Sequence, residues 1–469
     1  MIASSDSLPA YSSVPEPSLV FARGKLDKHP LRGLVRHGPY SAGVGVPARV
    51  RIAAMYPSGF APKIGGIIQE LRSPADPKEA TNYYVRYPGF EDTFRVTLEP
   101  VPQNLKHVLP SDLDRLAAQR NASGLAQKLF EEIGRAGSRR AEFDVLLLFL
   151  PDSWEACFQQ PDFDLHDYLK AYCAPMNIPI QIITEAAFRR KCRANVMWGL
   201  GLAVFTKANG IPWKLAGLRK EEAFVGISYA MKSGPLGTEY QTCCSQVFDP
   251  DGTGFQFVAY DVRDFEKDRR ENPYLSYTEM HSVMSRSLEI YQRGHGGRSP
   301  KKVTVHKNTP FREQEALGAI DAFNQNTEVE LVQIVRGVSW TFIKYAMGST
   351  SADAYPVDRG TILPLSPNEA LFWTQGSVRG VHTGGDHKNV YKEGALKPVP
   401  SPVLLRRFSG EGGWFETCSG IMGLTKMDWN NNTLYKKLPV TMEYSHRFAK
   451  INHWNQDLVD ELYDFRNFM

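Results

Sequence analysis

The sequence lacks the features that mark several protein classes. Only six of its 469 residues are cysteines, and none forms a Cys-x-x-Cys pair, so we do not expect a zinc ribbon. Scattered cysteines fit a reducing compartment. The longest apolar run, 145–151, is far too short to span a bilayer, and the Ser- and Pro-rich start lacks the basic stretch and apolar core of a signal peptide. We therefore expect a soluble cytoplasmic protein.

A strong excess of one charge sign is also missing. The chain carries 55 Lys and Arg residues against 51 Asp and Glu residues, a formal net charge of +4. This is not the balance of a protein that holds duplex DNA by charge alone, although local basic grooves remain possible. The length suffices for two or three domains with large cores.

The first third of the sequence predicts a flexible N-terminal segment, here called the lead, followed by a small folded lobe. Residues 1–18 are rich in Ser and Pro and predict a flexible lead. Short alternating runs and turn signals in residues 19–100 predict a mostly β structure. Apolar residues at helical spacing in residues 111–138 predict a helix. We therefore expect residues 19–138 to form an N-terminal lobe that leads into the next domain.

A strand–helix rhythm follows in residues 139–215. Residues 143–150, apolar except for Asp144, predict a strand of the kind found in buried parallel sheets, and residues 178–183 predict a second strand. Helices are predicted at 165–173 and 184–207. This order predicts a doubly wound, Rossmann-like unit, in which ligands bind at the carboxyl ends of the strands.

The remaining residues, 216–469, predict an RNase H-like domain. A strand at 224–228, a β-meander at 239–262, and then alternating helices and strands follow one another in the order of that fold. Residues 440–468 predict a helical end. The fold class expected for the whole chain is therefore α/β.

Four polar residues of the doubly wound unit suggest a binding pocket. His166 and Lys170 are four residues apart and share a helix face. Gln181 lies near a strand end, and Lys207 stands just before a glycine turn. If these side chains converge, two point charges and one directional amide suit a terminal phosphate. Spacing alone leaves open that the lysines are merely solvated.

Three motifs in fixed order resemble a known family. They are His166-x3-Lys170 with Gln181 and Lys207, the segment 205–215, and the segment 424–431 followed by 438–441. With these motifs the chain resembles the short prokaryotic Argonautes, which contain only MID and PIWI domains. The resemblance extends from residue 19 to residue 469. It implies a MID domain at 139–215 and a PIWI domain at 216–469.

The resemblance implies roles for the four polar residues. Lys170, Gln181 and Lys207 would contact the 5′-phosphate of a guide strand, and His166 would stack on its first base. A magnesium ion at that phosphate would be bound by Gln181 and the C-terminal carboxylate of Met469. Such a hard cation prefers oxygen donors and offsets the repulsion between the two anions. A disordered tail is the alternative.

The resemblance also implies that the PIWI domain is catalytically inactive. Two-metal nucleases need clustered carboxylates. Where active Argonautes carry two of their Asp residues, this chain has Ser228 and Asn308, which are poor metal ligands. The neighbouring Lys307 adds a positive charge that disfavours a cation. His446 fits the last position of the tetrad, but without the carboxylates we expect no enzyme activity in this chain.

As implied by the resemblance, the chain is the guide-binding subunit of a prokaryotic immune complex. A 5′-phosphorylated small RNA would recognise complementary single-stranded DNA of plasmids or phages. The partner would be an APAZ-domain effector that degrades NAD, with a sirtuin-like domain favoured over a TIR domain. The resulting heterodimer could assemble further on activation, and NAD depletion would cause abortive cell death.

Two other functions remain open from the residues. One is an active RNase H-like guided endonuclease, with Asp249, Asp251 and His446 as ligands and Glu271 or Glu279 as a glutamate candidate by position. The other is a generic nucleotide-binding α/β protein. For most of the basic residues of 216–469, taken one at a time, a solvated surface is the favoured interpretation. Those that could together line a duplex channel are Arg298, Lys301, Lys302, Lys307, Arg336, Lys344, Arg406, Arg407 and Lys426.

Overall fold

The chain forms two compact units. The computed structural model describes residues 10–78, 84–217, 221–234, 237–247, 256–262, 264–343, 357–378, 399–455 and 462–469. The first unit, here called the small-sheet unit, consists of Leu19–Lys214, Trp429–Asn432 and Lys450–Met469. The second, the large-sheet unit, consists of Met1–Ser18, Leu215–Asp428 and Thr433–Ala449.

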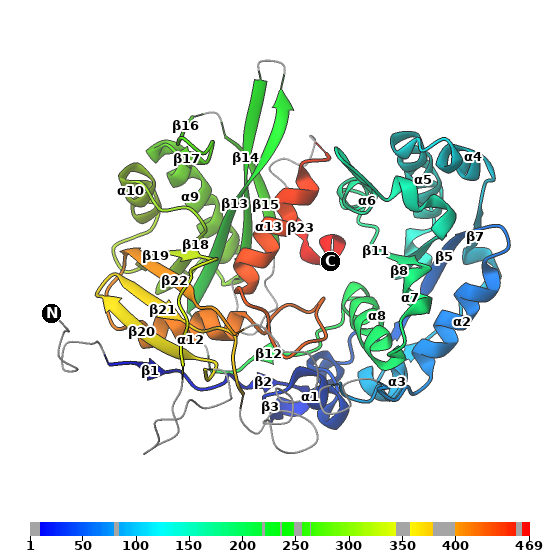
Figure 1. The fold of residues 1–469 in the computed structure, drawn as a ribbon, viewed down its shortest axis with the longest axis horizontal. Helices are drawn as coiled ribbons and strands as arrows, with labels where there is room; N and C mark the ends of the chain where they lie inside the picture. Colours follow the sequence, from blue (N-terminus) through cyan, green and yellow to red (C-terminus); the bar gives the residue numbers. More distant parts are fainter. Residues whose placement is uncertain are drawn as a thin grey trace. The chain divides into compact units, whose positions relative to one another are not determined.

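A four-stranded parallel sheet is the centre of the small-sheet unit (Figure 1). Its strands, in spatial order, are β11 (Ile180–Thr184), β8 (Val145–Leu150), β5 (Ile52–Pro57) and β7 (Lys106–Leu109). The chain adds β7 on one side of β5 and then returns to add β8 and β11 on the other side. The order of the strands thus reverses between β5 and β8, as in doubly wound sheets.

Helices pack against this sheet because its strands are apolar on both faces. All six residues of β8 are buried, which explains its continuous apolar run. Leu146 and Leu148 pack with α4, α5 and α6, whereas the ring of Phe149 contacts Phe188 of α7. The helices are α1 (Pro30–His37), α2 (Ala61–Arg72), α3 (Phe90–Phe94), α4 (Asp112–Ala118), α5 (Ala122–Gly137), α6 (Leu165–Cys173), α7 (Ala186–Arg189) and α8 (Arg193–Lys207).

Two helices expected to be continuous are interrupted. The stretch 111–138 forms α4 and α5, because Arg120 adopts a positive φ of 55° and Asn121 caps α5 by accepting the amide of Gly124 at 3.0 Å. The stretch 184–207 forms α7 and α8. Arg190 is extended, with ψ of 125°, and lies in the break between them.

The expected lobe at 19–138 is not separate from the unit that follows it. Its small β elements are present as β2 (Leu19–Val20), β3 (Leu26–Asp27), β4 (Arg49–Val50) and β6 (Thr97–Leu98). However, β5 and β7 from the same stretch are strands of the parallel sheet. The boundary expected at residue 139 therefore lies inside a single compact unit.

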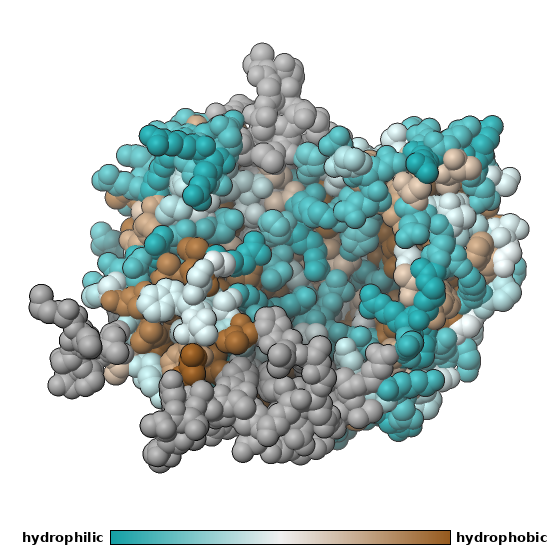
Figure 2. Space-filling view, in the orientation of Figure 1, coloured by the Kyte–Doolittle hydropathy of each residue, from teal (hydrophilic) through white to brown (hydrophobic). Residues whose placement is uncertain are grey.

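The large-sheet unit is built on a mixed sheet with the predicted RNase H-like order. β13 (Glu222–Gly234), β18 (Lys302–Lys307) and β19 (Glu328–Val335) are parallel, and β14 (Gly237–Val247) and β15 (Gln256–Val262) extend the sheet beyond β13. Beyond β19 lie β22 (Val403–Ser409), β21 (Glu369–Phe372), β20 (Thr361–Ser366) and β1 (Ser12–Ser13). Apolar side chains are exposed over β20–β22 (Figure 2), among them Leu365 and Phe408.

Helices cover both faces of this sheet. α9 (Tyr277–Gly294) and α10 (Glu313–Asp321) pack on one face, where Val225 and Val305 are part of the core. α12 (Trp414–Leu424) and α13 (Val440–Asn452) pack on the other, where Val332 and Ile334 are buried. The hairpin of β16 (Phe265–Lys267) and β17 (Pro273–Leu275) lies beside α9 and α10. The predicted mixed α/β fold class is confirmed.

The described part of the expected flexible lead is an ordered strand. Ser12 and Ser13 pair with β20, and the buried carboxylate of Glu16 contacts Arg359 at 2.8 Å and Lys426 at 2.7 Å. These long-range ion pairs, which leave no local signal in the sequence, hold residues 10–18 in place.

The chain's end is also less helical than expected. After α13 the described residues form β23 (Leu462–Asp464) and a short 3-10 helix at Phe465–Phe468. Among the described residues, no helix has the length and apolarity needed to cross a bilayer.

Candidate functional site

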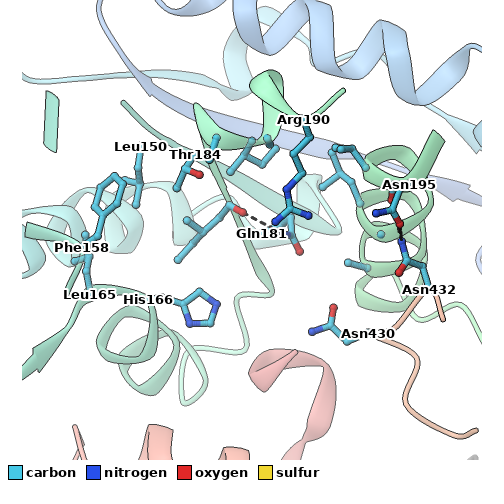
Figure 3. Close-up of a pocket in the computed structure, with 18 residues that line it drawn as sticks. Leu150, Phe158, Leu165, His166, Gln181, Thr184, Arg190, Asn195, Asn430 and Asn432 are labelled. Carbon is cyan, nitrogen blue, oxygen red and sulfur yellow. Dashed lines mark hydrogen bonds between the residues drawn. The ribbon is translucent and has the colours of Figure 1, made fainter. Parts of the chain in front are cut away.

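A cavity of about 500 Å³ opens at one edge of the parallel sheet in the small-sheet unit (Figure 3). It lies against β11, the end of β8, the first turn of α6 and the face of α8. All of its residues belong to the small-sheet unit. Its polar lining consists of His166, Gln181, Thr184, Arg190, Asn195, Asn430 and Asn432.

Gln181 and Lys207 meet behind the wall of this cavity, as the sequence predicts. Lys207 is the last residue of α8 and only 2% exposed, and its Nζ donates to Gln181 Oε1 at 2.6 Å. Gln181 Nε2 donates to the main-chain oxygen of Ile182 at 3.1 Å. Gln181 is the second residue of β11 rather than near its carboxyl end. The expected position is therefore wrong, but β11 is an edge strand, which leaves Gln181 beside the cavity.

Lys170 lies one turn after His166 on α6 and contacts the tail. Its side chain is buried, and its Nζ donates to the main-chain oxygens of Met469 and Phe468, the latter at 3.4 Å. The described tail is thus held in the small-sheet unit. Met469 lies against Lys170, while Gln181 lies against Lys207.

His166 is held by its neighbour Asp167. Its Nδ1 lies 2.8 Å from Asp167 Oδ1, and Lys450 at the end of α13 contacts the other carboxylate oxygen at 2.6 Å. Asp164 caps α6 through the amide of Asp167 at 3.1 Å and contacts Lys450 at 3.2 Å. The lysine offsets both carboxylates, so this cluster is an ion-pair network rather than a cation site.

The charges around His166 set its protonation state. Lys170 is the main cause that lowers the pKa of His166, and burial acts in the same direction, while Asp167 opposes both. Burial disfavours the ionised form of Asp167, but hydrogen bonds from His166 and Lys450 outweigh it and lower its pKa to about 2. A neutral imidazole beside an ionised carboxylate is the favoured state.

Sequence reasoning missed several residues of the cavity. Arg190 lies in the break between α7 and α8, and its side chain extends toward Gln181 in Figure 3. Asn432 donates to the main-chain oxygen of Asn195 at 2.9 Å, and Asn430 lies nearby. The available signal was the run of three asparagines at 430–432, which directly follows the buried Trp429.

Ser228 and Asn308 each come directly after the last paired residues of two neighbouring strands. β13 and β18 pair up to Ile227 and Lys307, and Ser228 and Asn308 are the next residues. Two residues earlier, Gly226 and His306 face Thr441 of α13: a Cβ on Gly226 would meet its main-chain oxygen at 2.1 Å, and His306 Nδ1 lies 2.8 Å from its Oγ1. Since side chains alternate along strands, Ser228 faces α13 too.

The other residues considered for catalysis are more dispersed. His446 is exposed on α13. Glu271 lies in the β16–β17 turn and Glu279 in the first turn of α9, on elements that pack on the opposite sheet face. Asp249 and Asp251 lie outside the described residues.

Lys307 does not act on the Ser228 position, contrary to expectation. It points to the α10 face, where both its side chain and that of Glu315 are fully buried and form an ion pair. Other basic residues proposed for a duplex channel are also paired within the unit: Lys302 and Arg407 with Glu330, Lys426 with Glu16, Arg406 with Glu369 and Lys301 with Glu221. Lys344 lies outside the described residues.

Comparisons with solved structures identify the type of fold. No protein-family description and no curated sequence matches the chain. Among solved structures, the chain is similar to Clostridium butyricum Argonaute bound to a guide DNA and a 19-mer target DNA, with a TM-score of 0.62 and 18% identity over 97% of the chain. Aa-Ago with externally bound siRNA gives a TM-score of 0.61 and 16% identity over 99% of the chain. The chain has an Argonaute-type fold.

The likeness covers only part of those Argonautes. A third structure, of A. aeolicus Argonaute, gives a TM-score of 0.58 and 14% identity over 98% of the chain. The chain spans 54% to 56% of the length of the three proteins.

Proposed function

We propose that the small-sheet unit binds the 5′-phosphate of a guide strand. The observation that carries this proposal is the gathering of His166 and Gln181 on one cavity, with the buried Lys170 and Lys207 directly behind them. Two buried ammonium groups and an amide are suited to a terminal phosphate. His166 is suited to stack on the first base. The Argonaute-type fold supports the same assignment.

A magnesium ion is part of this proposal. Gln181 Oε1 and the terminal oxygens of Met469 are the hard donors that such an ion prefers. In the structure both residues accept hydrogen bonds from lysines, and a phosphate that takes over those bonds would release the oxygens for the ion. The ion would supply positive charge between the phosphate and the tail.

We further propose that the guide is a small RNA and that its target is complementary single-stranded DNA of plasmids or phages. Base pairing would read the sequence, while the protein would read the backbone and the shape of the duplex. Target cutting is not part of this proposal. Ser228 and Asn308 offer no carboxylate where a two-metal site needs them, and His446 alone cannot replace them.

The activity that follows target recognition would then be carried out by a partner protein. We propose an APAZ-domain effector that degrades NAD, sirtuin-like rather than TIR, which forms a heterodimer with this chain in the cytoplasm of a prokaryote. Recognition of the target would activate this effector and cause abortive cell death. Such coupling requires that the effector contacts differ between the guide-bound and target-bound states.

Binding of defined guides to the purified chain tests the proposal. A 5′-phosphorylated RNA should bind more tightly than its 5′-hydroxyl counterpart, and Lys170→Ala with Lys207→Ala should abolish that difference. The matched control replaces two exposed lysines of the same unit, Lys25→Ala and Lys106→Ala, and should retain it. Equal binding of both RNAs by the unaltered chain would contradict the proposal.

A cleavage assay tests the second part. The chain is incubated with guide, complementary target and manganese. Guide-dependent products would show an active endonuclease and refute the proposed inactivity. A stable complex with intact target supports it.

A further inference from the structure

Two charged residues that are not part of the cavity lining hold His166. Asp167 is buried and contacts Nδ1 of His166, and Lys450 reaches the same carboxylate from a distant part of the sequence. Because an ionised carboxylate only accepts hydrogen bonds, Nδ1 must carry the proton. A ligand in the cavity therefore meets the other ring nitrogen, Nε2, or the ring face.

We propose that Asp167 and Lys450 are a positioning pair for His166: they fix the orientation of its ring and set the pH at which Nε2 takes up a proton when the guide phosphate binds. This inference rests on the proposed guide binding. In the empty cavity the positive charge of Lys170 opposes a second proton on the ring. A bound phosphate offsets that charge, so Nε2 can become protonated and donate to the guide.

The pair acts within a defined set of charges. On α6 itself, Lys170 and Asp167 are one turn or less from His166, and Asp164 precedes the helix. Lys450 comes from α13, Arg190 from the break after α7, and Lys207 reaches the cavity wall through Gln181 from α8. Asp167 contacts the ring directly, and Lys450 contacts Asp167 at 2.6 Å and Asp164 at 3.2 Å.

The two members of the pair should shift proton uptake in opposite directions. In Lys450→Met, the carboxylate of Asp167 loses its counter-charge and stabilises the imidazolium more strongly, so the pKa of His166 rises. In Asp167→Asn, the carboxylate is lost and the pKa falls further. A purely structural role would weaken guide binding in both variants without moving the pH dependence in opposite directions.

The experiment measures affinity for 5′-phosphorylated and 5′-hydroxyl RNA between pH 5 and pH 9. His166→Phe serves as the reference. Phenylalanine does not titrate, so the pH dependence of binding by this variant reports the ionisation of the phosphate and not that of His166. Relative to this reference, the phosphate preference of the unaltered chain should fall as pH rises, by up to about tenfold per pH unit for one proton. The midpoint of that fall should move to higher pH in Lys450→Met and to lower pH in Asp167→Asn. Lys450→Arg should restore it.

Each outcome of this experiment is informative. Identical midpoints in the unaltered chain and in both variants, with phosphate preference retained, would overturn the positioning pair but leave guide binding intact. If the unaltered chain binds 5′-phosphorylated and 5′-hydroxyl RNA equally at every pH, the proposed function itself is refuted.

Discussion

The chain buries lysines in two regions, and their partners differ. Lys307 of the large-sheet unit is fully buried against the carboxylate of Glu315, with the rings of Tyr274 and Phe311 at 4.9 and 5.4 Å from its Nζ. In the small-sheet unit, Lys170 donates to a terminal oxygen of Met469, and Lys207 donates to the amide oxygen of Gln181 at 2.6 Å. A neutral amide competes less strongly with an arriving anion than a buried carboxylate does, so Lys207 is better placed than Lys307 to bind a phosphate.

The polar groups around Ser228 and those around the cavity also differ. Near Ser228 the polar groups are neutral, as in His306, or paired across the sheet. Among the residues that line the cavity, Arg190 is charged and the other polar side chains are amides, a hydroxyl and the imidazole of His166. Internal compensation is typical of a packed core, while excess positive charge beside a cavity is typical of an anion site. The predictions below test this contrast.

The largest effect is expected from breaking the Lys307–Glu315 pair. Lys307→Met leaves a buried carboxylate without its partner and should lower the free energy of unfolding by about 3–5 kcal/mol. Lys307→Met with Glu315→Gln should recover most of that loss. Denaturant unfolding measures both, and an additive loss in the double variant would show that the two residues act independently.

A smaller effect is expected from the buried His306, whose burial lowers its pKa to about 4. Below the usual value near 6.5, the unfolded chain binds a proton that the folded chain excludes, so stability should fall between about pH 6.5 and pH 4. The loss at pH 5 relative to pH 7 should approach about 2 kcal/mol. His306→Gln should remove this dependence, whereas the exposed control His446→Gln should retain it.

Removal of a single cavity lysine should affect binding rather than folding. Lys207→Met keeps the volume and removes one charged hydrogen bond, worth about 1.5–3 kcal/mol, or roughly ten- to a hundredfold in affinity for a 5′-phosphorylated guide. Its free energy of unfolding should stay the same or rise. A marked loss of stability would mean that Lys207 is a structural lysine, as Lys307 is.

The smallest effect is expected at Ser228 and Asn308 of the large-sheet unit. Ser228→Asp with Asn308→Asp should place two carboxylates side by side and create a weak manganese site. At saturating manganese the double variant should be stabilised by about 1–3 kcal/mol, measured as a rise in melting temperature that the unaltered chain does not show. No manganese effect would mean that the two positions do not face the same site.

Local patterns predicted much of this structure, because they report on burial along one element. The apolar run of β8 predicted a buried parallel sheet. The four-residue spacing of His166 and Lys170 predicted that these residues share a helix face beside the site. Contacts between distant segments leave no such pattern. Lys450, Asn430 and Arg190 were therefore missed, and the ion pairs of Glu16 made an ordered strand from a segment whose composition predicts flexibility.

The cavity of the small-sheet unit is assembled from segments that are made at very different times. Its sheet and helices come from Leu19–Lys214, but Trp429–Asn432 and Lys450–Met469 belong to the same unit. During synthesis the ribosome must complete almost all of the large-sheet unit before Asn430, Lys450 and Met469 emerge. A nascent chain therefore carries the sheet of this unit well before it can complete the cavity.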